Sequence, residues 1–242
     1  MSVRRVVGLL LGATLLLAVS TACSRPEVQP LVMGAAPWSN TETSRYAITN
    51  LNGDFAGTLQ YQIQQADGGW IFRREISSSE TQEVISVETD DGVFLPRSAL
   101  LVRVYATGEE RVNTTYAGGQ VDMELTTVQN VTTNERNHIP SDARDQRTVL
   151  MLLRTLPLEK GYSARMNSFL PVANLLDRVT VNVLRREEIT VPAGTFDTWL
   201  VELDTGDSET RAWIGVDAPY PLVKFTESRN GGLFELEAFE AR

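Results

Sequence analysis

The chain is poor in the residues that build metal centres and disulfides. It has one histidine, His138, and one cysteine, Cys23, among 242 residues. The usual zinc sites need three or four His and Cys ligands, so the composition excludes them. A single cysteine also excludes an internal disulfide, so the folded domain must depend on its hydrophobic core. We therefore expect no metal and no cofactor.

The surroundings of the histidine do not make a convincing catalytic site. His138 lies in "NERNHIPSDARD", close in sequence to Ser141, Asp142 and Asp145. A Ser-His-Asp triad needs an oxyanion hole and a positioned nucleophile, and the chain has no Gly-x-Ser-x-Gly elbow. We interpret His138 as an exposed loop histidine.

Other catalytic and ion-binding patterns are also missing. The Gly-rich stretches "AGG" and "NGG" lead into predicted strands, whereas a phosphate loop leads into a helix. Oxygen ligands for calcium are conceivable in two groups of acids, but neither group has the spacing of an EF-hand loop. Acidic residues are plentiful, so a facing pair of carboxylates stays open, although no pair stands out. The two groups of acids are Asp90 with Asp91, and Asp204 with Asp207 and Glu209.

One stretch, "LVELDTGDSE" at residues 200–209, contains the Asp-Thr-Gly tripeptide of aspartic proteases. Those enzymes need two such aspartates sharing a proton, and this chain has one copy. Asp207 follows the tripeptide, where a small residue is usual. The flanking residues alternate as strands, so we predict a hairpin turn in which Gly206 takes a positive φ.

The balance of charge argues against nucleic acid as a partner. The chain has 22 basic and 31 acidic residues, a net charge of −9. Loss of Arg4 and Arg5 with a cleaved signal would make it −11. An acidic surface repels nucleic acid and gives no basic patch for anionic lipid.

The N-terminus predicts export and lipidation. Arg4 and Arg5 precede an apolar run over residues 6–19, which is too short to span a membrane, and small residues lead to Cys23. This arrangement resembles the lipobox of bacterial lipoproteins, in which the signal is cut before a cysteine that then carries lipid. Ala22 fits that pattern, whereas Ser20 stands where Leu is most common. The alternatives are an ordinary secretory signal with a stray cysteine and a retained signal anchor.

The resemblance implies a location in the cell envelope, anchored through lipid on Cys23 on the extracytoplasmic side. Ser24 follows the cysteine, not the Asp that resembles an inner-membrane retention signal. The expected site is the outer membrane if the cell has one, and otherwise the outer face of the cytoplasmic membrane.

We expect three regions: a signal peptide at 1–22, a lipidated tether at 23–44 and one β-rich domain at 45–242. The tether is rich in Pro, Ser and Thr. Trp38 is unusual for a free linker and is a candidate to pack back onto the domain. A polar loop is expected over residues 129–144.

From Arg45 onward the dominant hydrophobic period is two, and Gly, Asp and Asn turns separate the apolar runs. This pattern predicts a mainly β domain with a long, curved antiparallel sheet, a half-barrel or barrel-like, of about 10–12 strands. One segment, residues 144–156, has helical spacing and predicts a helix packed against the sheet. Ser141 or Asp142 is the expected N-cap, and Pro157 ends the helix. The apolar face of this helix comprises Val149, Leu152, Leu153 and Leu156.

Five motifs, in order, resemble an uncharacterised family of exported bacterial proteins, domain of unknown function 3108. They are "GDFAGTLQYQI" (53–63), "DDGVFLPRSAL" (90–100), "REEITVPAGTFDTWLVEL" (186–203), "RAWIGVDAPYPLVKF" (211–225) and "GGLFELEAF" (231–239). The resemblance implies a sheet curled around a helix, similar to the half-barrels of bacterial lipoprotein carriers, which hold acyl chains on the concave face. That family assigns no catalytic residues.

These observations favour a non-enzymatic, membrane-tethered binding or carrier module for a hydrophobic or amphipathic ligand, expected to be a monomer. The alternatives are a structural or protein-interaction module of the envelope and an enzyme of unrecognised type. Aromatic residues on predicted strands either fill the core or line an apolar groove. These candidates are Trp70, Phe72, Trp199, Trp213, Phe225 and Phe234.

Overall fold

The computed structural model describes residues 28–227 and 231–242. They form one 15-stranded sheet that is not closed, which confirms the mainly β fold and the single helix, although the strands outnumber the expected 10–12. The strands run in the order β8-β7-β6-β5-β4-β3-β2-β1-β15-β14-β13-β12-β11-β10-β9. They are β1 (Thr41–Thr49), β2 (Phe55–Ala66), β3 (Gly69–Ser77), β4 (Thr81–Asp90), β5 (Pro96–Tyr105), β6 (Gly108–Ala117), β7 (Gln120–Thr126), β8 (Thr132–His138), β9 (Arg144–Asp145), β10 (Ser163–Leu170), β11 (Leu175–Val191), β12 (Gly194–Asp204), β13 (Glu209–Gly215), β14 (Leu222–Glu227) and β15 (Gly232–Ala241).

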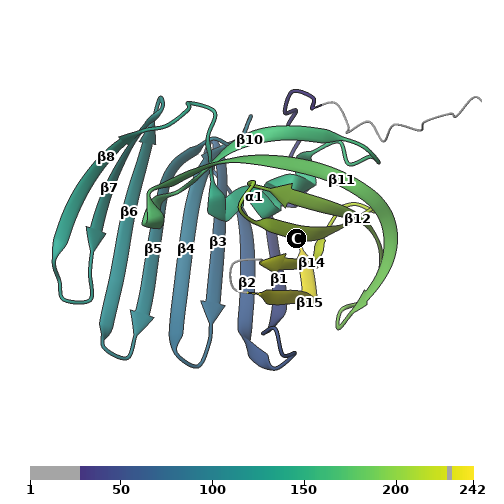
Figure 1. The fold of residues 1–242 in the computed structure, drawn as a ribbon, viewed down its shortest axis with the longest axis horizontal. Coiled ribbons are helices and arrows are strands. Elements are labelled where there is room, and N and C mark those ends of the chain that lie inside the picture. Colours follow the sequence, from purple (N-terminus) through teal and green to yellow (C-terminus); the bar gives the residue numbers. More distant parts are fainter. Residues whose placement is uncertain (1–27, 228–230) are drawn as a thin grey trace, which may run out of the picture.

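The first and last strands join the two halves of the sheet. β1 pairs antiparallel with both β2 and β15. From this junction the sheet continues through β2 to β7 to the edge strand β8 on one side. On the other side it continues through β14 to β10 to the edge strand β9. The sheet bends strongly, so that the green and yellow strands curve in front of the blue ones with the helix between them (Figure 1).

The period of two explains why these segments are strands with one face inside. In β2 the side chains of Leu59, Tyr61 and Ile63 are buried, whereas Gln64 is exposed and Gln62 is half-buried. Alternate residues of a strand point to opposite faces of a sheet, so one face becomes the core. The same alternation holds in β11, where Val179, Val181 and Val183 are buried.

The helix is shorter than predicted and is capped by a different residue. α1 (Gln146–Leu152) continues into a 3-10 turn, η1 (Leu153–Thr155). Its N-cap is Asp145, which accepts a hydrogen bond from the backbone N–H of Arg147, and not Ser141 or Asp142 as expected. The reason is that Arg144 and Asp145 first pair with β10 as β9, so the helix cannot begin earlier. The predicted apolar face is buried: Val149, Leu152, Leu153 and Leu156.

The polar stretch 129–144, expected as a loop, contains strand β8 and the first residue of β9. β8 pairs antiparallel with β7 along its whole length. It forms one edge of the sheet, and six of its seven residues are exposed. A strand exposed on both faces has no alternation of apolar and polar residues, which is why its sequence resembles a loop.

The described part of the expected tether packs against the domain. The backbone N–H of Gln29 donates to the carbonyl of Ser163, and that of Gly34 donates to the carbonyl of Thr155. Trp38 is buried, and its ring makes edge-to-face contacts with neighbouring aromatic rings. Residues 28–40 therefore cover the end of the sheet interior near η1.

Candidate functional site

A cavity of about 600 Å³ lies on the inner side of the sheet, beside α1. Both halves of the sheet contribute to its wall, from β1 to β5 and from β10 to β15. Ligand-binding pockets in proteins commonly enclose about 300–1,000 Å³, so this cavity is large enough for an organic molecule.

One part of the cavity wall is apolar. Val149 and Leu150 approach from α1, while strands of the second half contribute further aliphatic and aromatic side chains. A wall of this kind binds hydrocarbon because apolar surface leaves water on contact, at roughly 25 cal/mol per Å². The strand residues in this part are Leu170, Val179, Leu203 and Phe234.

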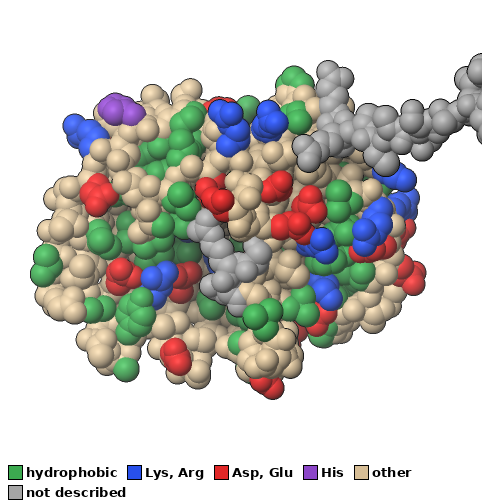
Figure 2. Space-filling model, viewed as in Figure 1, with side chains coloured by type: hydrophobic (Ala, Val, Ile, Leu, Met, Phe, Trp, Pro, Cys, Tyr) green, Lys and Arg blue, Asp and Glu red, His purple; other side chains and the backbone are tan. Residues whose placement is uncertain are grey.

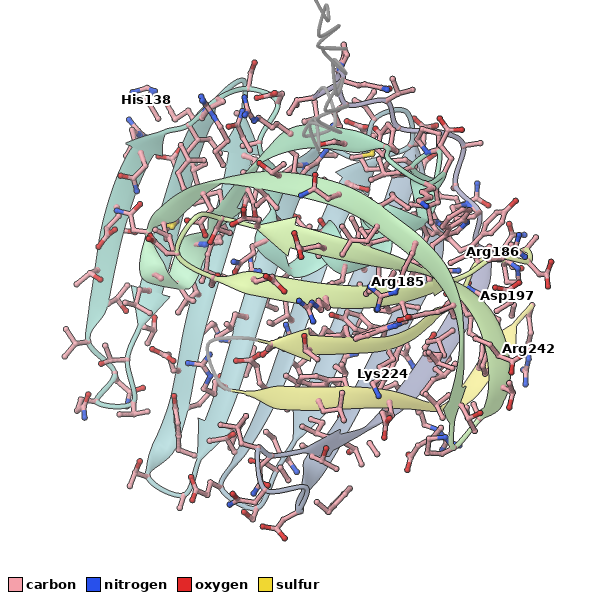
Figure 3. The ribbon with its side chains drawn as sticks, turned by 45° about the vertical axis from the view of Figure 1, so that its right-hand side comes forward. His138, Arg185, Arg186, Asp197, Lys224 and Arg242 are labelled. Carbon is pink, nitrogen blue, oxygen red and sulfur yellow. The ribbon has the colours of Figure 1, made fainter. Side chains whose placement is uncertain are left out.

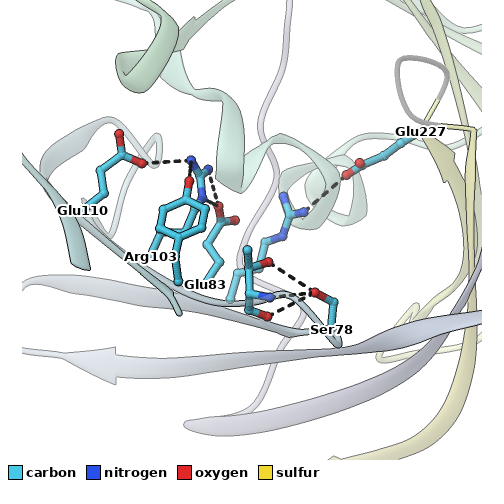
Figure 4. A network of polar contacts seen from close by, with 8 residues as sticks. Ser78, Glu83, Arg103, Glu110 and Glu227 are labelled. Carbon is cyan, nitrogen blue, oxygen red and sulfur yellow. Dashed lines mark hydrogen bonds and ion pairs between the residues drawn. The ribbon is translucent and has the colours of Figure 1, made fainter. Parts of the chain in front are cut away.

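The opposite part of the wall, formed by β3, β4 and β5, carries charged residues. Arg103 donates from Nε to Oε2 of Glu83 at 2.8 Å and from Nη1 to Oε2 of Glu110 at 3.0 Å (Figure 4). Burial acts to lower the pKa of Arg103, but hydrogen bonds to Tyr105 and Glu83 and the Glu83 charge outweigh it and raise this pKa.

A second ion pair crosses from one half of the sheet to the other. Arg74 on β3 lies 3.3 Å from Glu227 on β14, measured from Nη2 to Oε1 (Figure 4). Burial acts to lower the pKa of Arg74, while Tyr61 and Glu227 raise it, and the net change is upward. Burial raises the pKa of Tyr61, which lines the same wall. Both groups keep their usual charge at neutral pH.

The third charged group belongs to the start of α1. Arg147 donates from Nε to Oδ1 of Asp145 at 2.7 Å, and Tyr116 donates to Oδ2 of the same carboxylate at 2.7 Å. Asp145 is fully buried, and its two oxygens accept bonds from both neighbours. The carboxylate therefore fixes the guanidinium of Arg147 at the cavity wall.

Three donors on this wall have no hydrogen-bond partner in the described protein. They are Nε of Arg74, Nη1 of Arg147 and the hydroxyl of Ser168. These atoms have almost no accessible surface, and similar unpartnered buried atoms occur away from the cavity, among them Nε of Arg154 and Nε1 of Trp38.

The sequence matches one protein family over most of its length. The family described as "Protein of unknown function (DUF3108)" matches residues 45–237. The chain belongs to this family. No curated protein matches it.

The DUF3108 domain shares its fold with a solved structure. The crystal structure of a beta-barrel-like protein of the family DUF1849 from Brucella abortus has a TM-score of 0.55, at 12% identity, over 85% of this chain and 99% of that one. A Bacteroides fragilis protein with a YmcC-like fold has a TM-score of 0.29, at 10% identity, over 86% and 100%. The first score indicates a common fold, whereas the second is too low to do so.

The DUF3108 domain does not gather the predicted aromatic residues into one binding surface. Trp70 and Phe72 pack around Trp38 in the core. Phe225 is fully buried and stacks on Phe234, with 4.2 Å between ring centroids, and only Phe234 of the six candidates lines the cavity.

The remaining two tryptophans contact charged side chains. Trp199 lies under the guanidinium of Arg186, which also pairs with Asp197 (Figure 3). Trp213 donates to Glu187 at 2.6 Å. Neither tryptophan lines the cavity. On the face shown in Figure 2, most basic side chains lie close to acidic ones, so no broad area of one sign forms there.

Sequence reasoning missed the charged wall, although a signal for it exists. Arg74 stands between the inward residues Phe72 and Ile76, and Arg103 follows the inward residue Leu101 by two positions. A charge at an inward position of an alternating strand is unusual in a packed core and points to a polar site. Glu83, two positions before Ile85, follows the same rule.

The histidine region contains no triad. His138 ends β8 at an exposed edge of the sheet, within a strand and not in a loop (Figure 3). Asp142 accepts a hydrogen bond from Asn167, and Asp145 holds Arg147. Across residues 28–227 and 231–242, no three His, Cys, Asp or Glu side chains are grouped to hold a metal ion. Cys23 and the predicted signal peptide lie outside the described residues.

Asp204-Thr-Gly forms the hairpin between β12 and β13, as predicted. Thr205 and Ser208 close the turn through their backbones, Gly206 has a φ of 86°, and its N–H donates to Oδ1 of Asp204 at 2.7 Å. The carboxylate has a local structural role.

Asp204→Ala is therefore expected to lower the free energy of unfolding by about 0.5–1.5 kcal/mol, because one hydrogen bond in an exposed turn is lost. Urea unfolding monitored by circular dichroism measures this change. Loss of a measurable peptidase activity on this substitution would instead support a protease.

Proposed function

We propose that this DUF3108 protein is a binding or carrier module for an amphipathic ligand, tethered to the membrane by lipid on Cys23 and facing away from the cytoplasm. The observation that carries the proposal is the cavity of about 600 Å³, with aliphatic side chains on one part of its wall and ion pairs on another. Such a wall complements a molecule that has a hydrocarbon part and a polar part.

The tether rests on the N-terminal sequence. Within the described ranges no helix has the length and apolarity needed to cross a bilayer. The export signal and Cys23 supply the proposed attachment, since several acyl chains on one residue give stable anchoring.

Three titrating groups at the cavity are poorly suited to acid–base catalysis near neutral pH. The pKa values of Arg74, Arg103 and Tyr61 are all shifted upward, away from neutral pH. General acid–base catalysis is most efficient with a pKa near the working pH, and these shifts run in the opposite direction. A protein that only scaffolds partners has no need of an internal cavity, so the binding role also fits better than that alternative.

Native mass spectrometry and lipid extraction of the purified full-length protein test the proposal. We expect a co-purifying amphiphile, and saturable binding of a fluorescent fatty-acid probe to the emptied protein. Leu150→Trp should weaken this binding, because Leu150 lines the cavity and a larger side chain there would narrow it.

Leu176→Trp is the matched control, since Leu176 is exposed and does not line the cavity. The control variant should bind the probe as the wild type does. Absence of both co-purifying lipid and probe binding in the wild type would refute the proposal. Equal binding by the Leu150→Trp variant would place the site elsewhere.

A further inference from the structure

Residues 28–40 are part of the folded domain, so little chain is left between the domain and Cys23. The backbone N–H groups of Gln29 and Gly34 donate to β10 and to η1, and the side chain of Trp38 is buried. This segment therefore cannot serve as a spacer that lifts the domain away from its lipid anchor.

The length of the remaining chain limits how the domain can lie on a membrane. Residues 24–27 separate Cys23 from Val28, and five steps between Cα atoms span at most about 18 Å. β1 begins directly after residues 28–40 and has 9 residues, which span about 30 Å up to the β1–β2 turn. The start of the described chain and this turn lie at opposite ends of the view in Figure 1. With the turn against the bilayer, Val28 would lie farther from it than this chain can reach.

The end of the domain that carries residues 28–40 presents apolar side chains to solvent. Val28 and Val32 are exposed in the segment itself. The ring of Phe94 lies 5.5 Å from that of Trp38, between centroids, and the neighbouring Val93 is exposed. The β4–β5 turn therefore adds an apolar side chain beside the segment.

A fourth apolar side chain comes from the second half of the sheet. Arg154 lies over the Trp38 ring and donates to the carbonyl of Pro219 at 2.7 Å. Tyr220, the next residue, is 38% exposed. Three segments that meet at Trp38 thus carry the anchor-side patch, which we define as Val28, Val32, Val93 and Tyr220.

A patch of this size does not need a high affinity of its own. A short tether makes the contact with the bilayer intramolecular, so weak apolar contacts are sufficient. Binding to a bilayer surface depends on buried apolar area and on attraction to anionic lipid. Because the chain has a net charge of −9, apolar contact is the contribution that remains.

We infer that the domain rests on the lipid bilayer through the anchor-side patch, with its cavity on the side turned away from the membrane. Thr49 and Asn50 line the cavity at the far end of β1, and Ser78 and Thr205 line it from two other hairpin turns. Asn50 is exposed, so the cavity reaches the surface at that end. A ligand would then enter from the aqueous compartment. This inference rests on the lipid anchor in the proposed function and adds the orientation of the domain.

A fluorescent label at four single positions tests the inference on the full-length, lipidated protein. Val32→Cys and Val93→Cys place the label on the patch, whereas Leu51→Cys and Phe55→Cys place it at the β1–β2 turn. Acylated Cys23 does not react with a maleimide dye, so each variant is labelled once. In phosphatidylethanolamine–phosphatidylglycerol vesicles that contain a spin-labelled lipid, we expect quenching at the patch at least about threefold stronger than at the turn.

The two turn positions are a stringent control. Leu51 and Phe55 are 83% and 68% exposed, more than Val32 at 58%. If apolar exposure alone set the orientation, the turn would lie in the bilayer and the order of quenching would be reversed.

A charge on the patch should weaken the contact. Val32→Glu with Val93→Glu is expected to reduce the quenching of a label at Tyr220→Cys by at least about twofold, because a carboxylate resists transfer into an apolar environment. Val104→Glu with Val131→Glu changes two exposed valines outside the patch and should leave this quenching unchanged.

Intact mass spectrometry separates two failures. If Cys23 carries no acyl chain, the anchor in the proposed function fails, and this inference fails with it. If the acyl chains are present and Leu51 and Phe55 are quenched as strongly as Val32 and Val93, the anchor stands and the orientation is overturned. Probe binding by the cavity is measured separately in both cases.

Discussion

Glu42→Ala is expected to lower the free energy of unfolding by about 3–5 kcal/mol, because it leaves the guanidinium of Arg154 buried without its partner. The side chains of Glu42 and Arg154 are 1% and 0% exposed. Arg154 donates to both carboxylate oxygens of Glu42, and also to the carbonyl of Pro219 at 2.7 Å. The pair thereby joins β1, η1 and the segment between β13 and β14.

Urea unfolding of the variant and the wild type measures this change. Glu240→Ala is the matched control, since the pair of Glu240 with Arg242 is exposed and should contribute less than about 1 kcal/mol. The double variant Glu42→Met with Arg154→Met should lose less free energy of unfolding than the two single variants lose when their losses are added. A loss below 1 kcal/mol for Glu42→Ala would show that the buried charge is solvated in solution.

Trp38→Ala is expected to lower the free energy of unfolding by about 3–5 kcal/mol, the usual range for removing a large buried aromatic side chain. The Trp38 ring lies 5.6 Å from that of Trp70, 5.3 Å from that of Phe72 and 5.5 Å from that of Phe94, between centroids. Arg154 also lies over the Trp38 ring. Its removal would leave a hole beneath the N-terminal segment, so residues 28–40 should become sensitive to protease.

Two further substitutions test whether the lost packing of the Trp38 ring causes the loss of stability. Trp38→Phe keeps most of the packing and removes an indole N–H that has no partner, so the loss should be under about 1.5 kcal/mol. Val32→Ala changes an exposed residue of the same segment and should have little effect. Limited proteolysis and urea unfolding provide the measurements. Wild-type stability of Trp38→Ala would mean that the segment is not part of the folded unit.

Local patterns were sufficient to predict the class of fold. Alternation identifies β2 and β11, and the spacing of Val149, Leu152 and Leu153 identifies the helix. The patterns fail at β8, because an edge strand exposed on both faces has no apolar side. They also fail at the N-cap, because the pairing of β9 with β10 decides where α1 begins.

The candidate site depended on contacts that no local pattern contains. Arg74 and Glu227, which pair across the cavity wall, are 153 positions apart in the sequence. The aromatic residues chosen from the sequence are mostly core, since large apolar side chains are more often buried than functional. The inward charges on β3, β4 and β5 are a better guide, because a charge inside a sheet needs a partner.

The pairing of β1 with β15 affects how the chain folds. Glu42 on β1 lies opposite Ala241 on β15, so the junction joins residues nearly two hundred positions apart. Contacts of such high sequence separation form slowly because a long loop must close first. Until β15 arrives, β1 is an open edge able to pair with another chain. Protection of that edge until β15 is in place would therefore matter more for this protein than for one built from local hairpins.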